Sequence, residues 1–265
     1  MPPRPQRSPG RTRGRVPRPA LRLALRLALL GGVLLDAGTA GAIVGGREAP
    51  DDPLARSSVM VLTSSGGVCT GIVVARDAVL TAGHCVAGAG ENRVHWREDG
   101  AAPVLAEVAA RSLHPGYDGD AIRGRTRSID LALIRTRAAL PDRFAPATLS
   151  AAMPRAGAGL TLGGYGAARQ GDPRSTGRFR TAPLPVVEPY GPSRILVWLQ
   201  SASGRVGGCQ GDSGGPVSDE AGILAVAAWV KDACGGLTQG ILLGPQRDWI
   251  DRTLAGWSAQ ARWAP

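Results

Sequence analysis

The chain has 265 residues, of which 43% are hydrophobic and 20% are charged, and this balance is that of a globular protein and excludes a disordered chain. The 38 glycines and 21 prolines favour many turns and short strands over long helices, so we expect an all-β fold. The net charge is +10, but eight arginines and one acid precede residue 43 and leave only +3 on residues 43–265, which argues against nucleic-acid binding.

The first 42 residues have the order of a secretory signal peptide. A basic, proline-rich start precedes the apolar stretch LALLGGVLL at 27–35, and Ala40, Gly41 and Ala42 follow. These are the charged, apolar and small-residue regions that signal peptidase recognises. The nine residues at 27–35 are too few to span a bilayer, which disfavours a lone membrane anchor. Cleavage after Ala42 would start the mature chain at Ile43, and cleavage after Ala40 is the alternative.

From residue 43 onward, short β-rich runs alternate with turn residues and predict a barrel or a sandwich. The predicted strands are 57–62, 71–75, 78–82, 93–96, 130–135, 194–199, 222–230 and 240–243. Near the end, Pro245 opens a predicted helix whose apolar residues recur at helical spacing and are expected to face the core. These residues are Trp249, Ile250, Leu254 and Trp257. Segments 118–128 and 169–180 predict exposed loops with solvated arginines.

Four cysteines follow the predicted cleavage site: Cys69, Cys85, Cys209 and Cys234. Export implies an oxidising compartment, where an even number of cysteines predicts disulfides. Three pairings are possible, and proximity along the chain favours Cys69 with Cys85 and Cys209 with Cys234. A zinc site would need closer pairs such as C-x-x-C, and the sequence has none.

The stretch CQGDSGG at 209–215 sets a serine among glycines. Glycines permit positive φ and close backbone approach, so the run predicts a tight turn that presents Ser213. A nucleophilic serine needs a base within reach and a third group that orients the base. The alternative is a glycine-rich surface loop with an incidental serine.

The chain has three candidate bases, His84, His95 and His114. His95 lies on a predicted strand and His114 precedes a proline, so both fit structural roles. His84 follows an apolar strand in TAGHC, beside a cysteine expected to form a disulfide, and is the best base. Asp130 heads the apolar run DLALIR, where a buried carboxylate needs a partner such as an imidazolium. A surface aspartate at a strand end is the alternative.

Four motifs in this order resemble those of the chymotrypsin/trypsin family of serine endopeptidases. They are IVGG at 43–46, TAGHC at 81–85, DLALIR at 130–135 and GDSGGP at 211–216. The likeness covers residues 43 to about 260. It implies two six-stranded antiparallel β-barrels packed face to face, about 43–145 and about 150–244, and a C-terminal helix at about 245–260.

The resemblance implies catalytic roles for three residues. Ser213 attacks the scissile carbonyl, His84 accepts and later returns the proton, and Asp130 orients the imidazole. The backbone N–H groups of Gly211 and Ser213 form the oxyanion hole. Labelling with a fluorophosphonate would separate this enzyme from a catalytically silent binding or adhesion protein of the same fold, which usually lacks a triad member.

The resemblance also implies activation by a new N-terminus. Asp212 pairs in the family with the ammonium of the cleaved IVGG terminus, which is Ile43 in this chain. The small residues before Ile43 fit signal peptidase, so we expect no long propeptide.

P1 is the substrate residue whose carbonyl group is attacked. The resemblance implies that the pocket for its side chain contains Gly207, Ala228, Trp229, Val230 and Gly240. Gly207 at its floor has no carboxylate to pair with Arg or Lys. Val230 stands where a glycine commonly leaves the slot open, and it narrows the entrance. We therefore expect a preference for small to medium aliphatic P1 residues.

These expectations describe a secreted, extracellular, monomeric hydrolase that acts on proteins or peptides. We expect no cofactor, no metal, no nucleic-acid partner and no stable membrane anchor. The leader rich in Arg and Ala, with no further domain, favours a bacterial source.

Overall fold

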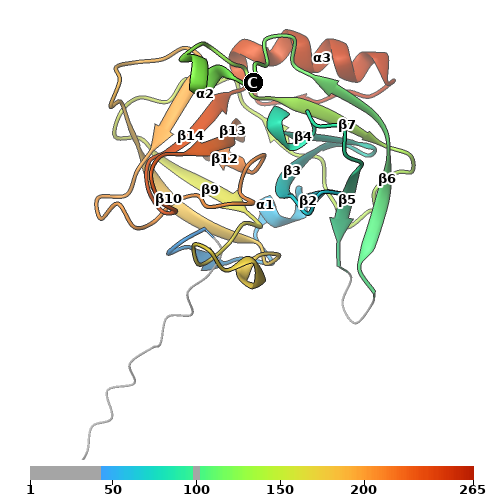
Figure 1. Cartoon of the computed structure of the whole chain (residues 1–265). Coiled ribbons are helices and arrows are strands. Elements are labelled where there is room, and N and C mark those ends of the chain that lie inside the picture. The colour runs from blue at the N-terminus through green and yellow to red at the C-terminus, as the bar shows by residue number, and fades with distance from the viewer. Residues whose placement is uncertain (1–42, 98–101) are drawn as a thin grey trace, which may run out of the picture. The chain divides into compact units, whose positions relative to one another are not determined.

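The computed structural model describes residues 43–97 and 102–265 (Figure 1), so the predicted signal peptide at 1–42 lies outside the described residues. Two closed six-stranded antiparallel β-barrels and a C-terminal helix form the described part of the chain, which confirms the predicted fold class. Within these ranges no helix is long and apolar enough to cross a membrane.

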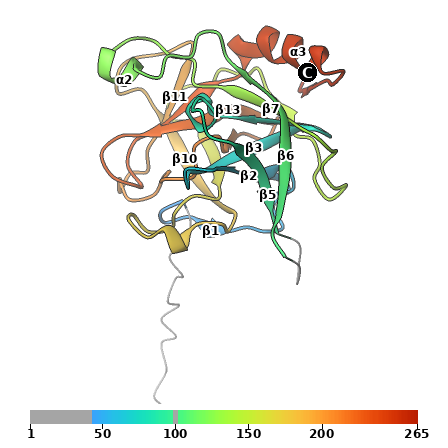
Figure 2. The same cartoon turned by 45° about the vertical axis from the view of Figure 1, so that its right-hand side comes forward.

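The first barrel contains six strands in the order β2–β3–β4–β7–β6–β5, of which β2, β3, β5, β6 and β7 are labelled in Figure 2. They are β2 (Ser58–Thr63), β3 (Val68–Ala75), β4 (Ala78–Thr81), β5 (Asn92–Trp96), β6 (Val104–Leu113) and β7 (Ala132–Thr136). Successive side chains on a strand point to opposite faces, so every second residue enters the barrel. Val59 and Val61 of β2 meet Val73 of β3 and Ile134 of β7 in this interior.

The second barrel closes because β12 pairs with both β9 and β13. Its strands are β9 (Gly159–Gly164), β10 (Arg180–Val187), β11 (Leu196–Leu199), β12 (Pro216–Ser218), β13 (Ile223–Val230) and β14 (Thr238–Leu242). Three short strands extend the sheet: β1 (Arg47–Glu48) on β10, and β8 (Thr148–Leu149) with β15 (Arg262–Trp263) beside β13. The helical segments are α1 (Pro53–Arg56), η1 (Gly83–Cys85), α2 (Ala121–Gly124), η2 (Pro173–Ser175), η3 (Gly244–Gln246) and α3 (Arg247–Gly256).

Strand β10 is absent from the sequence-based expectations, as are β6, β9 and β12, and its sequence contains two prolines. Proline has no N–H to donate to a ladder and usually argues against a central strand. Here Pro183 and Pro185 face outward and are exposed, whereas Leu184 between them is buried in the barrel. The alternation of burial therefore holds although the local propensity is poor.

The expectation of solvated arginines is wrong for Arg180, at the end of the predicted loop 169–180. Its side chain is only 5% exposed and pairs with Glu48 of β1, since a buried guanidinium needs a partner. Glu48 also pairs with Arg178, and the hydrogen bond from Arg178 holds the pKa of Glu48 below its usual range, with Arg180 lowering it further. These ion pairs fasten β1 to β10.

The segment at 43–48 packs on the second barrel, although the sequence-based boundary assigns it to the first. Ile43 is fully buried in the apolar core of the second barrel, beside Leu160 and Leu162. Val44 forms an isolated bridge with Gly207. The start of the predicted mature chain therefore lies in the same barrel as the turn that carries Ser213.

Helix α3 packs on a core that both barrels share. Ile250 and Leu254 are buried in a cluster that includes Ile72 of β3 and Ile223 of β13. Trp249 and Trp257 are partly buried against it, as their helical spacing predicts. Burying apolar area from both barrels in one cluster stabilises their contact.

Two disulfides, Cys69–Cys85 and Cys209–Cys234, are present, which confirms the prediction of disulfide bonds. They are the pairs that proximity along the chain favours. Each closes a short loop and stabilises the fold by about 3 kcal/mol in the chain-entropy model. The first lies beside His84 and the second starts four residues before Ser213, so both brace predicted site residues.

Candidate active site

His84 is placed by the short helical turn η1, which follows strand β4. Its neighbour Gly83 leaves no space for a side chain, because a Cβ there would lie 2.8 Å from Cδ2 of Tyr117 and 3.0 Å from Oδ1 of Asp130. The turn therefore approaches Asp130 closely, and Asp130 comes from the segment just before β7. The disulfide through Cys85 holds the other side of the turn.

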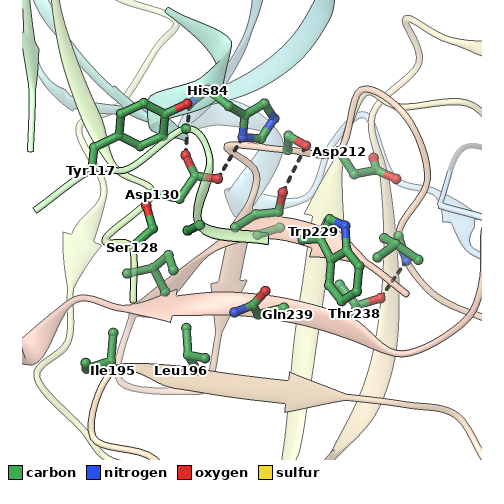
Figure 3. A pocket seen from close by; sticks show the side chains of 18 of the residues that line it. His84, Tyr117, Ser128, Asp130, Ile195, Leu196, Asp212, Trp229, Thr238 and Gln239 are labelled. Atoms are coloured by element: carbon green, nitrogen blue, oxygen red, sulfur yellow. Dashed lines mark hydrogen bonds and ion pairs between the residues drawn. The ribbon is translucent and has the colours of Figure 1, made fainter. Parts of the chain in front are cut away.

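Both carboxylate oxygens of Asp130 bind His84 (Figure 3). Oδ2 lies 2.7 Å from Nδ1 of the imidazole, and Oδ1 accepts the backbone N–H of His84 at 2.8 Å. An aspartate on Nδ1 places the proton there and leaves Nε2 as the basic nitrogen. The imidazole is 40% exposed and the carboxylate 18% exposed, so Nε2 can meet a substrate while Asp130 stays shielded.

Ser213 lines the same cavity as His84 and Asp130, and the volume of this cavity is about 800 Å³. The Ser213 hydroxyl donates to the carbonyl of Ala228 at 3.4 Å. No hydrogen bond joins Ser213 to His84 in the described part of the chain. Catalytic hydrogen bonds often form only in the substrate complex, so the long bond to Ala228 does not count against a proton transfer to His84.

Within the described ranges, the N–H groups of Gln210, Gly211 and Ser213 in the glycine-rich turn have no hydrogen-bond partner, and those of Gly211 and Ser213 are the predicted oxyanion donors. The carbonyl of Gln210 accepts from Ala167 at 2.8 Å, and that of Asp212 accepts from Gly215 at 2.9 Å. The N–H of a trans peptide points opposite to its C=O. Each bonded carbonyl therefore fixes the direction of the next N–H, and Gly211 supports the turn with a φ of +98° that favours glycine.

Asp212 is only 2% exposed and packs against the backbone at Gly164 and Gly166. Its Oδ1 accepts the N–H of Gly166 at 2.8 Å, and its Oδ2 accepts that of Cys209 at 2.9 Å. A Cβ on Gly164 would lie 2.2 Å from Oδ1, so the carboxylate fits against bare backbone. Burial raises the pKa of Asp212 to about 7, although both hydrogen bonds and the charge of Arg180 lower it.

Three of the five predicted pocket residues line the cavity, and two do not. Ala228, Trp229 and Val230 belong to its lining, whereas Gly207 and Gly240 lie outside it. The cavity also contains Gly208 and Thr238, which the sequence analysis did not name.

Thr238 and Val230 fill the slot beside Gly208. Val230 pairs with Thr238 across β13 and β14, and Thr238 accepts the N–H of Gly208 at 3.0 Å. A Cβ on Gly208 would lie 3.0 Å from Cγ2 of Val230. The pairing register of β13 and β14 places Thr238 in the pocket. The alternation of apolar and polar residues along each strand does not reveal this register.

The described residues contain one group of possible metal ligands, Cys69, His84 and Cys85. The two cysteines are joined in a disulfide, so neither offers the thiolate that a metal would need. The group therefore does not form a metal donor set.

Comparisons with known proteins agree on one family. A family model described as Trypsin matches residues 43–250. A trypsin-like protease of Streptomyces glaucescens is 31% identical over 213 residues, which cover 72% of this chain and 74% of that protein. Human kallikrein-8 is 25% identical over 178 residues, or 63% of this chain and 68% of that protein. A solved structure of neuropsin, described as a serine protease expressed in the limbic system of mouse brain, shares the fold with a TM-score of 0.67 and 24% identity, covering 80% of this chain and 99% of that one.

Proposed function

The chain belongs to the trypsin family of serine endopeptidases, and on that premise we propose that Ser213, His84 and Asp130 hydrolyse peptide bonds through an acyl-enzyme. The observation that carries the proposal is the double hydrogen bond between Asp130 and His84, in the cavity that Ser213 lines. The bond to Nδ1 orients the imidazole, and the bond to the backbone N–H fixes the residue that carries it, which leaves Nε2 as the nitrogen that acts as the base.

In this mechanism the Ser213 hydroxyl attacks the scissile carbonyl while Nε2 of His84 takes its proton. The negative oxygen of the tetrahedral intermediate accepts from the N–H groups of Gly211 and Ser213. His84 then protonates the leaving amine, and the acyl-enzyme forms. Water attacks the ester with His84 as base, and Ser213 is released.

A fluorophosphonate probe tests the function directly, because a serine that an adjacent base activates displaces its fluoride and becomes phosphonylated. We expect stoichiometric labelling of the secreted protein at Ser213, read by mass spectrometry of the labelled peptide. The heat-denatured protein and Ser213→Ala serve as controls and should remain unlabelled. Failure of the folded protein to label would instead support a catalytically silent binding protein of the same fold.

The pocket supports a preference for small to medium aliphatic P1 residues. Val230 and Thr238 occupy the space that a large side chain would enter, and Gly207 contributes no carboxylate there. The exposed carboxylate of Asp232 lines the cavity and is the acid that could still attract a basic P1 residue. Substrates with Ala or Val at P1 are therefore expected to be cleaved faster than those with Phe or Arg.

We predict that Val230→Gly raises kcat/KM for a P1 Phe substrate relative to a P1 Ala substrate by about ten- to hundredfold, the range of a pocket that gains a few methylene groups of space. Val230→Ala should give an intermediate ratio. The ratios are measured with matched peptide amides that differ only at P1. Efficient cleavage after Arg by the unaltered enzyme would contradict the specificity, and loss of that cleavage in Asp232→Asn would identify the acid responsible.

We also propose that the enzyme is exported and starts at Ile43 without a long propeptide. Three observations support this: the two disulfides, the small residues before Ile43 and the backbone of Ile43 itself. Ile43 has a φ of +52°, which is strained for a β-branched residue by about 1–3 kcal/mol. Cleavage before Ile43 would relieve this backbone strain, because the peptide bond that defines φ of Ile43 would no longer exist. A monomeric, bacterial enzyme without a membrane anchor remains part of this proposal.

A further inference from the structure

Thr70 of strand β3 is fully buried where the first barrel meets the Ser213 turn. Its hydroxyl donates to the carbonyl of Gly211 at 2.8 Å and accepts the N–H of Tyr165 at 3.0 Å. Its backbone N–H donates to the carbonyl of Ser213 at 2.8 Å. One residue of the first barrel thus binds the carbonyls of both Gly211 and Ser213 in the second.

The orientation of the Gly211 carbonyl determines how the N–H groups of Gly211 and Ser213 lie relative to each other. It belongs to the peptide unit that joins Gly211 to Asp212, and the unit on each side carries one of those N–H groups. Rotation of the middle unit changes ψ of Gly211 and φ of Asp212 and so moves the two donors relative to each other. Gly211 has no Cβ to resist such a rotation.

The Thr70 hydroxyl supplies the restraint that Gly211 lacks. On the opposite side of the same peptide unit, the N–H of Asp212 donates to Cys209 at 3.1 Å. The unit is therefore bonded at both ends. Because the Thr70 hydroxyl also accepts from Tyr165, its single proton is directed to Gly211.

We propose that Thr70 is a positioning residue that holds the Gly211–Asp212 peptide so that the N–H groups of Gly211 and Ser213 face the oxyanion. The inference rests on the proposed function and extends it to a side chain in the other barrel. Thr70 does not line the cavity, so its effect is expected in the transition state, where the oxygen becomes negative, and not in substrate binding.

The test compares Thr70→Val with Thr70→Ser in the full secreted chain. Valine keeps the shape but removes the hydroxyl, and serine keeps the hydroxyl. We expect Thr70→Val to lower kcat by about ten- to hundredfold, less than the loss of an oxyanion donor itself, with KM within about twofold. Thr70→Ser should stay within about threefold of the unaltered enzyme. A peptide boronic acid forms a tetrahedral adduct that places an oxygen in the oxyanion hole. Its affinity should fall together with kcat in Thr70→Val and should be unchanged in Thr70→Ser.

Thr136→Val is the matched control, since Thr136 is also buried and its hydroxyl donates to the carbonyl of Ala138 at 2.7 Å. It should lower thermal stability without lowering kcat. If Thr70→Val yields no folded protein, Thr70→Ala removes the same hydroxyl and takes its place. A kcat equal to that of the unaltered enzyme in the hydroxyl-free variant would overturn the role of Thr70. Lack of fluorophosphonate labelling in the unaltered protein would overturn the proposed function instead.

Discussion

Replacing Ser213 by Ala is expected to lower kcat by on the order of 10⁶, the loss typical of removing the nucleophile from such a triad. The methyl group cannot attack a carbonyl, so only direct attack by water remains, with the oxyanion donors still stabilising the oxygen of the tetrahedral intermediate. His84→Ala should cost a similar factor, because the lining of the cavity contains no second histidine that could accept the proton of Ser213. The two losses should not add in the double variant, since both residues act in the same step.

The measurement is the steady-state hydrolysis of a peptide substrate, with circular dichroism as the check on folding. Ser203→Ala is the control, because Ser203 is exposed and lies outside the cavity. It should retain full activity. Turnover by Ser213→Ala within tenfold of the unaltered enzyme would disprove the assignment of the nucleophile.

Retaining Gly41 and Ala42 in front of Ile43 is expected to lower kcat/KM by a factor of about 10² to 10³. The extension replaces the Ile43 ammonium by an amide, so Asp212 stays buried without a cation, which costs roughly 3–5 kcal/mol and disturbs the oxyanion turn. The measurement is N-terminal sequencing of the secreted protein together with activity, and Ile43 as the first residue is the expected result. A fully active protein that retains both residues would refute the mechanism.

The extended form should also lose stability as pH rises. The pKa of Asp212 is raised to about 7 in the folded chain from an ordinary value of 3.8. The folded state therefore binds a proton that the unfolded state has released, so stability falls between about pH 4 and pH 7 by about 4 kcal/mol at most. In the chain that starts at Ile43 the ammonium lowers the pKa of Asp212 and reduces this loss.

Urea unfolding of both forms at several pH values measures the difference. Asp142→Asn, which removes an exposed carboxylate, is the control and should leave the difference unchanged. The ammonium of Ile43 loses its charge above about pH 8, so the activity of the mature chain should fall there. Equal pH dependence of stability in the two forms would show that Ile43 does not pair with Asp212.

The sequence alone pointed to the candidate catalytic residues and determined where the continuous apolar strands lie. Runs such as 71–75 and 222–230 have local signals, because each carries its own hydrophobic pattern and turn residues. The motifs around His84, Asp130 and Ser213 are also visible in the sequence. Close packing and tight turns there require particular neighbouring residues, such as glycines. Proximity was enough for the cysteines, because both disulfides close short loops.

Only the tertiary structure decided how distant segments meet. β10 is a strand although it contains Pro183 and Pro185, because barrel closure pairs it with β9 and β11. Val230 and Thr238 fill the pocket through the register of a hairpin, and Thr70 reaches Gly211 across 141 positions. Such contacts depend on the closure of whole barrels, whose free energy is spread over many residues, and so they leave no periodic pattern in the chain.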